Sequence, residues 1–304
     1  MPVARSSHTE PTARGGGVVF VVIAFLMGGA FYRYGYIAKA EFILVACSFL
    51  MATVGMADDY LKLRNHIRFV AQIIIASVFL MFNGVPETLS LAPLTMRLGA
   101  FAWPLSILFI VWSVNLFNFM DGLDAFASTT AITIFATLGI LGAAAGVPHF
   151  PILMLVLIAS IAGFLKWNFP PAKIFMGDGG SYFLGFMIAG AALALNTNYG
   201  VPLMVPVTLY GLFWFDATIT LIRRMLNGEK WYMPHKSHAY QRLHQAGYSH
   251  LRVTGYALLL NIILAFLGAA GFFYPQYMLA FFAAGLLLLG FLYAVVERIK
   301  PLKN

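Results

Sequence analysis

The sequence predicts an all-α integral membrane protein, a polytopic bundle of about ten transmembrane helices with active-site loops on its cytoplasmic face. The 304 residues are 61% hydrophobic and only 10% charged, with a mean hydropathy of +0.84. A soluble domain of this length could not keep so apolar a composition in water. The apolar stretches are about twenty residues long and are separated by short polar turns, which indicates spanning helices and not the alternating strands of a barrel.

The ten expected spanning helices are each near the length that crosses a bilayer. They cover residues 17–33, 40–57, 67–83, 99–117, 127–147, 150–166, 181–196, 202–222, 253–273 and 276–296. No internal repeat is visible, and the longest loop, residues 223–252, is too short to fold independently. We therefore predict a single membrane-embedded domain over residues 1–304.

The distribution of basic residues predicts the orientation, because ten spans bring both termini to one side of the membrane. With cytoplasmic termini, the outside set contains only Arg33, Lys39 and Arg97. The inside set is Arg5, Arg14, Lys62, Arg64, Arg68, Lys166, Lys173, Arg223, Arg224, Lys230, Lys236, Arg242, Arg252, Arg298, Lys300 and Lys303. This bias satisfies the positive-inside rule, so we expect both termini and all the motifs below on the cytoplasmic side.

Three further features narrow the class of protein. Cys47 is the only cysteine and falls inside an apolar stretch, so neither a disulfide nor a cysteine-based metal site is expected. The polar start MPVARSSHTEPTARGGG lacks the apolar run of a signal peptide. The net charge of +8 comes from basic residues scattered between helices, which membrane topology explains better than nucleic-acid binding.

An acidic pair closes the second predicted span. Asp58 and Asp59 stand in GMADDYLKLR, with Lys62 one helical turn beyond Asp58. One interpretation is a solvated helix end with an ordinary ion pair between Asp58 and Lys62. We favour a role in chemistry, because two adjacent acids at the end of an apolar helix are costly to keep.

A polar stripe ends the fourth predicted span, in VNLFNFMDGLDAFAS. Asn115, Asn118 and Asp121 recur at every third residue and so share one side of a helix, and Gly122 loosens the backbone before Asp124. Such amides and carboxylates can hold a hydrated cation or hydrogen-bond a sugar and a nucleotide, whereas the alternative is a hydrogen-bonded seam between helices. The pattern favours a ligand.

The loop KWNFPPAKIFMGDGGSYFLG is predicted to bind phosphate and a cation. Its prolines interrupt regular helix, glycines flank Asp178, and Ser181 is placed to cap the next helix. Backbone amides near a helix start suit phosphate, and Asp178 can approach Mg²⁺, which favours one or two carboxylates plus phosphate oxygens. The alternatives are an ordinary aspartate in a tight turn and, for Phe175, a core or lipid-facing aromatic.

Three remaining features are less specific. The loop RRMLNGEKWYMPHKSHAYQRLHQAGYSH gathers basic residues with four histidines, His235, His238, His244 and His250. Irregular spacing without cysteine argues against zinc, and the loop is expected to clamp a pyrophosphate or to act as a positive-inside tether. Arg14 precedes three glycines that either help to bind substrate or permit close helix packing. Asp216, inside a predicted span, is either functional or a structural partner of a neighbouring helix.

Taken in order, PTARGGG, ADDYLK, NLFNFMDGLD, NFPPAKIFMGDGGS and HKSHAYQRL resemble the motifs of the polyprenyl-phosphate N-acetylhexosamine-1-phosphate transferase superfamily, over nearly the whole chain. The resemblance implies a bacterial inner-membrane enzyme that uses Mg²⁺, with Mn²⁺ as the alternative. In that reaction, an oxygen of undecaprenyl phosphate attacks the β-phosphorus of a UDP-N-acetylhexosamine, and UMP leaves. The implied partners are these two substrates and the lipid bilayer, and we carry a homodimer as a hypothesis.

The resemblance also implies roles for individual residues. Asp178 is implied as the magnesium ligand, and Asp58 or Asp59 as the group that deprotonates the lipid phosphate or attacks covalently. Asn168 and Phe175 are implied contacts of the nucleotide, with Phe175 stacked on uracil. The other implied substrate contacts are Lys62, Asp121, Asp124, His238 and Arg242, and the motifs above add Arg14, Asn115 and Asn118 as candidates.

The sequence departs from the family pattern in two places. Many relatives carry a His-x-His-His run where this chain has His238, Ala239, Tyr240 and Gln241. The form SHAYQ resembles the branch that initiates O-antigen, which implies UDP-GlcNAc or a deoxy relative such as UDP-FucNAc or UDP-QuiNAc and points away from the muramoyl-pentapeptide substrate. Relatives usually have a spanning helix before the PTARGGG-like loop, and we expect that helix to be missing here.

The main alternative from another class is a transporter or flippase of a sugar or a lipid-linked intermediate. Transporters place coupling charges near the bilayer midplane, often in paired repeats. In this sequence only Asp216 is predicted inside a span, whereas five acids are predicted at one face: Asp58, Asp59, Asp121, Asp124 and Asp178. CDP-alcohol phosphatidyltransferases also use aspartates on magnesium, but their longer single acidic motif is absent. We therefore favour the transferase.

Overall fold

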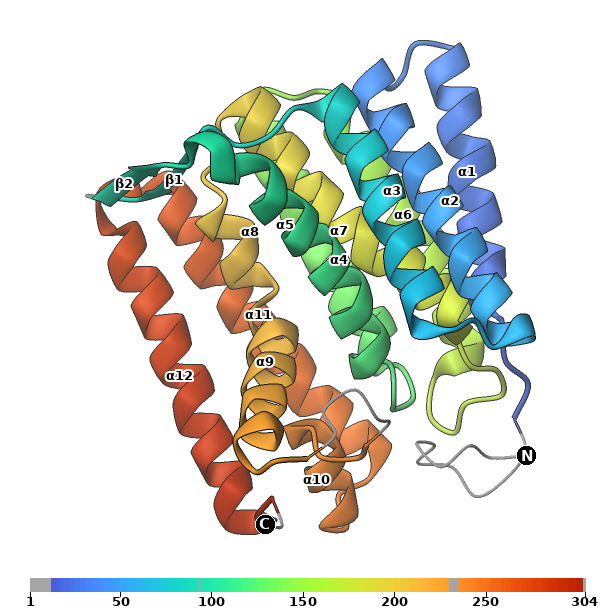
Figure 1. Cartoon of the computed structure of the whole chain (residues 1–304), viewed down its shortest axis with the longest axis vertical. Helices are drawn as coiled ribbons and strands as arrows, with labels where there is room; N and C mark the ends of the chain where they lie inside the picture. Colours follow the sequence, from blue (N-terminus) through green and yellow to red (C-terminus); the bar gives the residue numbers. More distant parts are fainter. Residues whose placement is uncertain (1–11, 93, 230–234, 303–304) are drawn as a thin grey trace.

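The computed structural model describes residues 12–92, 94–229 and 235–302, which form a bundle of antiparallel helices (Figure 1). Among these residues, eight helices are long and apolar enough to cross a membrane. They are α2 (Lys39–Leu61), α3 (Asn65–Asn83), α4 (Ala102–Met120), α5 (Phe126–Ala144), α6 (Phe150–Asn168), α7 (Gly177–Tyr199), α11 (His250–Phe273) and α12 (Met278–Ile299). A shorter apolar helix of 17 residues, α1 (Gly17–Arg33), precedes them. The prediction of an all-α polytopic membrane protein is confirmed.

The structure differs from ten continuous spans at residues 202–222, where the helix is broken. α8 (Met204–Leu209) and α9 (Gly211–Leu226) meet at Tyr210. The Trp214 indole N–H donates to the Val207 carbonyl at 2.8 Å. The break is tolerated because this side chain satisfies a carbonyl in the last turn of α8 that lacks its helical partner.

The connections contain a few short elements. The α3–α4 connection holds a hairpin of β1 (Thr88–Leu91) and β2 (Leu94–Arg97), which pair antiparallel with Thr88 opposite Arg97, followed by the 3-10 turn η1 (Gly99–Phe101). The long loop before α11 contains α10 (Ala239–Gln245), and η2 (Pro275–Tyr277) begins the last helical segment.

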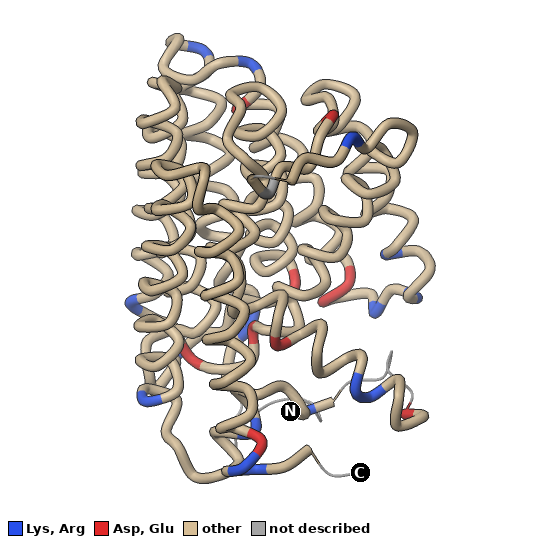
Figure 2. Tube along the Cα trace, turned by 90° about the vertical axis from the view of Figure 1, so that its left-hand side faces the viewer, with Lys and Arg blue, Asp and Glu red and all other residues tan. Residues whose placement is uncertain are grey.

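The helices alternate in direction, so their connections lie at two opposite ends of the bundle (Figure 1). We call the end that holds Thr12, Leu302 and the α2–α3, α4–α5 and α6–α7 connections the motif end, and the end that holds β1 and β2 the hairpin end. Arg33, Lys39 and Arg97 lie at the hairpin end, and the other described lysines and arginines lie at the motif end (Figure 2). Arg5, Lys230 and Lys303 from the charge count lie outside the described residues.

α7 lies at the centre of the bundle, and every residue from Gly177 to Leu195 is buried. Small residues let α2 and α4 pack closely against it. A Cβ added to Gly185 would lie 2.7 Å from the Ser113 carbonyl oxygen of α4, and one added to Gly55 of α2 would overlap the Asp178 carbonyl. Gly55 therefore lets the end of α2 meet the first turn of α7, and Gly185 lets α4 pack closely on the third turn.

We expect Gly55→Ala to lower the free energy of unfolding by about 1–3 kcal/mol, because the added methyl group must push α2 away from α7. The measurement is thermal unfolding of the purified protein in detergent. Gly163→Ala on α6 is the matched control, because no atom lies within 4 Å of its added Cβ. Equal melting temperatures for the two variants would contradict the close packing of α2 on α7.

Candidate active site

Two loops that are far apart in the sequence pair at the motif end. Ala13 and Ile174 form a parallel bridge. The Phe175 N–H donates to the Ala13 carbonyl at 2.8 Å, and the Phe175 carbonyl accepts the Gly16 N–H at 2.9 Å. This pairing fixes Arg14 and Phe175 beside the start of α7, so the PTARGGG and NFPPAKIFMGDGGS motifs form one surface.

Asp59 and Asp178 meet where α2 ends and α7 begins. The Asp178 N–H donates to Asp59 Oδ2 at 2.7 Å, and Asp59 Oδ1 lies 3.8 Å from Arg14 Nη1. Gly177 has a φ of +80°, and a Cβ there would lie 2.9 Å from Asp59 Oδ2. Glycine is therefore required for this approach, in which the Asp59 carboxylate binds an amide of the first turn of α7.

Asn118 joins α4 to the first turn of α7, whereas Asn115 joins α4 to α3. Asn118 Nδ2 donates to Asp178 Oδ1 and to Ser181 Oγ, both at 2.9 Å. Asp178 is only 6% exposed, so this amide orients its carboxylate. Asn115 Nδ2 donates instead to Gln72 Oε1 of α3 at 2.7 Å, which is the helix seam that the sequence left as an alternative.

Asp58 points to α3 and not to α7. Its Oδ2 accepts a hydrogen bond from Arg68 Nη1 at 2.6 Å, and Arg68 Nη2 also donates to Asn65 Oδ1. The Asp58 side chain is 7% exposed and that of Arg68 is 28% exposed. The two adjacent acids thus have different surroundings, and Asp58 obtains its cation from the next helix.

The alternative of an ion pair between Asp58 and Lys62 is not what the structure shows. α2 ends at Leu61, and Lys62 has a φ of +52°, in the left-handed region. The Lys62 ammonium donates to the Asp59 main-chain carbonyl at 2.9 Å. Lys62 therefore satisfies an unpaired carbonyl at the end of the helix, and its amine stays close to the acidic pair.

Asn168 and Asp124 join the turn after α4 to the loop before α7. Asn168 Oδ1 accepts the Ala125 N–H, and Asn168 Nδ2 donates to the Ile174 carbonyl, both at 3.0 Å. Asp124 Oδ2 accepts a loop N–H at 3.0 Å. Asp124 and Asn168 are 4% and 5% exposed, and Asp121 at the end of α4 is half-buried. The observed contacts of Asn168 lie within the chain, and its implied contact with a nucleotide stays a prediction.

Asp216 binds the chain at the start of α10, in the segment that we call the histidine loop because it carries His235, His238, His244 and His250. Its Oδ1 accepts hydrogen bonds from the Ala239 N–H at 2.9 Å and from the Thr220 hydroxyl at 3.0 Å, and it lies 3.7 Å from His238 Nδ1. Asp216 and His238 are both 3% exposed. Of the two interpretations of Asp216, the geometry favours a structural partner, one that fixes His238 at the start of α10.

Arg242 is directed at α12. Its Nη1 donates to Glu297 Oε2 at 2.6 Å and to the Lys300 carbonyl at 3.0 Å, and its guanidinium lies 5.0 Å from the centre of the Tyr293 ring. Arg242 is 2% exposed. The structure does not bring it to Asp59 and Asp178, and its implied contact with phosphate or sugar stays a prediction.

His235 adds no positive charge to this loop near neutral pH. Burial, with smaller contributions from the nearby His238 and Arg224, lowers the pKa of His235 to about 3. The expected cationic clamp must therefore rely on lysines and arginines of the motif end.

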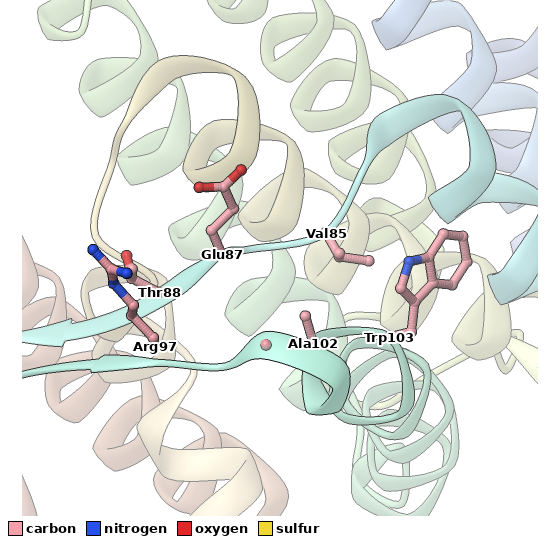
Figure 3. A pocket seen from close by; sticks show the side chains of 7 residues that line it. Val85, Glu87, Thr88, Arg97, Ala102 and Trp103 are labelled. Atoms are coloured by element: carbon pink, nitrogen blue, oxygen red, sulfur yellow. The ribbon is translucent and has the colours of Figure 1, made fainter.

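A separate hollow with a volume of about 640 Å³ lies at the hairpin end (Figure 3). Its lining residues are Val85, Glu87, Thr88, Arg97, Gly99, Ala102 and Trp103. Ala102 begins α4, whereas Asn118 is in the last turn of the same helix, about 24 Å away at the helical rise. This hollow therefore belongs to the hairpin end of the bundle and is separate from Asp59 and Asp178 at the motif end.

The acidic site lies within a region that matches a known family. Residues 41–196 match the model described as glycosyl transferase family 4. This range is more than half of the chain and contains Asp58, Asp59, Asn118 and Asp178.

The chain belongs to glycosyl transferase family 4.

Named relatives match between 64% and 90% of this chain. A Bacillus subtilis protein named probable undecaprenyl-phosphate N-acetylglucosaminyl 1-phosphate transferase is 35% identical over 256 residues, 82% of this chain and 70% of the relative. A Mycobacterium tuberculosis H37Rv protein named decaprenyl-phosphate N-acetylglucosaminephosphotransferase is 32% identical over 306 residues, 90% of this chain and 75% of the relative. A phospho-N-acetylmuramoyl-pentapeptide-transferase of Symbiobacterium thermophilum is 32% identical over 213 residues, 64% of each chain.

Sequence reasoning missed Arg68 among the residues of this glycosyl transferase family 4 site. The available signal was electrostatic, since two adjacent carboxylates require a cation and Arg68 lies in the first turns of the next helix. Helical spacing indicates only Lys62, and that spacing does not continue past the end of α2 at Leu61.

We expect Arg68→Gln to lower the free energy of unfolding by about 1–3 kcal/mol, between the values for exposed and buried ion pairs, because Asp58 is left without its cation. The measurement is a double-mutant cycle with Asp58→Asn, followed by thermal unfolding in detergent. Arg64→Gln, whose side chain is exposed, is the control for loss of one positive charge. Additive effects of Arg68→Gln and Asp58→Asn would contradict the pairing.

Proposed function

We propose that this protein transfers N-acetylhexosamine 1-phosphate from a UDP-sugar to undecaprenyl phosphate, with release of UMP, at the cytoplasmic face of a bacterial inner membrane. The observation that carries the proposal is the contact of Asp59 with Asp178 at the motif end of a membrane bundle, with Arg14 and Asn118 beside it. GlcNAc is the sugar that we propose first, because the Bacillus subtilis and Mycobacterium tuberculosis relatives, which match over 80% of this chain, are named for it.

The donor set at this site suits Mg²⁺. No group of three or more His, Cys, Asp or Glu side chains that could form a closed metal cage is found among the described residues. Magnesium is commonly held by one or two carboxylates together with substrate phosphates and water. Asp178, oriented by Asn118, would hold the ion with Asp59 alongside. When bound, the ion neutralises charge that develops on the diphosphate.

The proposed reaction forms one bond at phosphorus and breaks another. A phosphate oxygen of the lipid bonds to the β-phosphorus, and the bond from that phosphorus to the bridging oxygen breaks, so that UMP carries the electron pair away. Asp58 or Asp59 takes the proton of the lipid phosphate or attacks covalently, as the family resemblance implies. Arg14 and Arg68 lie within reach of these acids and offset the repulsion between two anionic substrates.

Two further features support the orientation and the pathway that we propose. The basic residues at the motif end satisfy the positive-inside rule when this end faces the cytoplasm, where nucleotide sugars are made. A product of this type is a membrane-bound sugar diphosphate, so the reaction would be the first membrane step of O-antigen or another cell-envelope polysaccharide.

We expect the full chain, purified in detergent with undecaprenyl phosphate and Mg²⁺, to release UMP from UDP-GlcNAc. The measurement compares UDP-GlcNAc with UDP-FucNAc, UDP-QuiNAc and UDP-MurNAc-pentapeptide as donors. Absence of UMP with every donor would reject the proposed transfer. Release from the muramoyl-pentapeptide donor alone would reject the proposed sugar class.

We expect Asp178→Asn to reduce turnover by a factor of about a hundred or more and to abolish its dependence on Mg²⁺, because one charge of the cation site is removed. The measurement is a magnesium titration of UMP release. Glu87→Gln, an exposed acid at the hairpin end, is the control and should keep the wild-type titration curve. A wild-type curve for Asp178→Asn would contradict its role at the metal.

A further inference from the structure

Asp124 lies at the junction of three segments of the motif end. Its Oδ2 accepts the Ala172 N–H at 3.0 Å and lies 3.2 Å from His250 Nδ1. Its main-chain carbonyl accepts the Thr254 hydroxyl at 2.9 Å. One residue of the α4–α5 turn therefore contacts both the loop that leads to Asp178 and the first two turns of α11.

His250 is held in place from several sides. It is the first residue of α11, directly after Ser249, whose hydroxyl oxygen accepts the Arg252 N–H as a helix cap. Its side chain is 13% exposed, and its ring packs edge to face on His244 at 4.5 Å. His244 is fixed in turn, because its Nδ1 lies 3.0 Å from the Tyr248 carbonyl oxygen. The His250 ring is thus a rigid neighbour of the Asp124 carboxylate.

We propose that His250 is a positioning residue: it holds the Asp124 carboxylate on the Ala172 N–H and so fixes the loop that presents Phe175 and Asp178. This inference rests on the proposed function and deepens it. His250 Nδ1 lies 3.2 Å from Asp124 Oδ2 and 3.4 Å from the Asp124 main-chain nitrogen, and we assign the ring proton to Nδ1 because the carboxylate oxygen is the nearer partner. The carboxylate has two oxygens and a rotatable bond, and the N–H of Nδ1 selects the orientation in which Ala172 is bound. Through the contact of His250 with Asp124, the start of α11 and the α6–α7 loop that contains Ala172 are held by the same carboxylate.

The proposal predicts which replacement keeps the contact. In histidine, Nδ1 is attached to the same carbon as the side-chain nitrogen of asparagine, two bonds from Cβ, whereas the nitrogen of glutamine lies one bond further out. His250→Asn therefore keeps a donor near Asp124 Oδ2, and His250→Gln and His250→Ala do not. If His250 served only as the first residue of α11, the Asn and Gln variants should lose similar amounts of activity.

The first experiment measures UMP release by the full chain with UDP-GlcNAc as the varied substrate. We expect His250→Ala and His250→Gln to lower kcat/KM for the nucleotide sugar on the order of tenfold to a hundredfold, the effect of losing a hydrogen bond to a charged group. His250→Asn should recover most of this loss, and the KM for undecaprenyl phosphate should stay unchanged in all three. Arg252→Ala, exposed on the same turn of α11, is the matched control.

The second experiment does not depend on activity. Hydrogen–deuterium exchange should be faster in the peptide that contains Ala172 for His250→Ala than for Arg252→Ala or His250→Asn, because Asp124 no longer holds that N–H. Unchanged exchange at Ala172 would overturn the inference, as would equal kcat/KM losses for the Asn and Gln variants. A wild-type protein that releases no UMP rejects the proposed function alone, and the exchange comparison still decides the role of His250.

Discussion

Asp59 and Asp178 lie in contact at the end of two apolar helices, although two carboxylates repel each other strongly where little water is present. The repulsion is offset by the Asp178 N–H, which donates to Asp59, by the positive end of α7, and by Arg14 at 3.8 Å. Glycine at 55 and 177 is needed because any side chain there would separate the two helix ends. The pair therefore depends on the close packing of α2 on α7 and on the docking of the chain before α1.

The basic residues of the motif end have two physical effects at once. They orient the bundle in the membrane, and they supply the cations that buried acids require. Arg68 neutralises Asp58, and Arg14 lies beside Asp59 with 40% of its side chain exposed, where it can also contact an anionic substrate. Under the proposed function, the same excess of positive charge on one face attracts the two phosphate-bearing substrates.

The sequence predicted the spanning helices to within a few residues, because the length of an apolar run is set by the thickness of the bilayer. It did not predict the break at Tyr210, since the bond from Trp214 to Val207 that tolerates the break is a tertiary contact within an apolar run. Asn115 and Asn118 share one helical stripe, yet only Asn118 reaches Asp178. Periodicity gives the side of a helix, whereas the partner depends on which helix packs there.

The cation that binds Asp58 also depends on tertiary packing and not on periodicity. A spacing of four residues predicts an ion pair only while the helix continues, and Lys62 adopts a left-handed conformation directly after α2 ends. The cation of Asp58 therefore comes from Arg68, ten residues away, after the chain has turned. Helix termination was the missing information, because no glycine or proline marks it in this sequence.

The two halves of the chain contribute different parts of the site. The region that matches the family, residues 41–196, carries the acids, whereas α9 to α12 carry the histidine loop. That loop is held on the α12 side, where Arg242 and Arg223 both bind Glu297. It is held on the α4 side, where the Tyr240 hydroxyl donates to the Phe119 carbonyl at 3.0 Å. The segment that carries His238 and Arg242 is therefore held by α4 on one side and by α12 on the other.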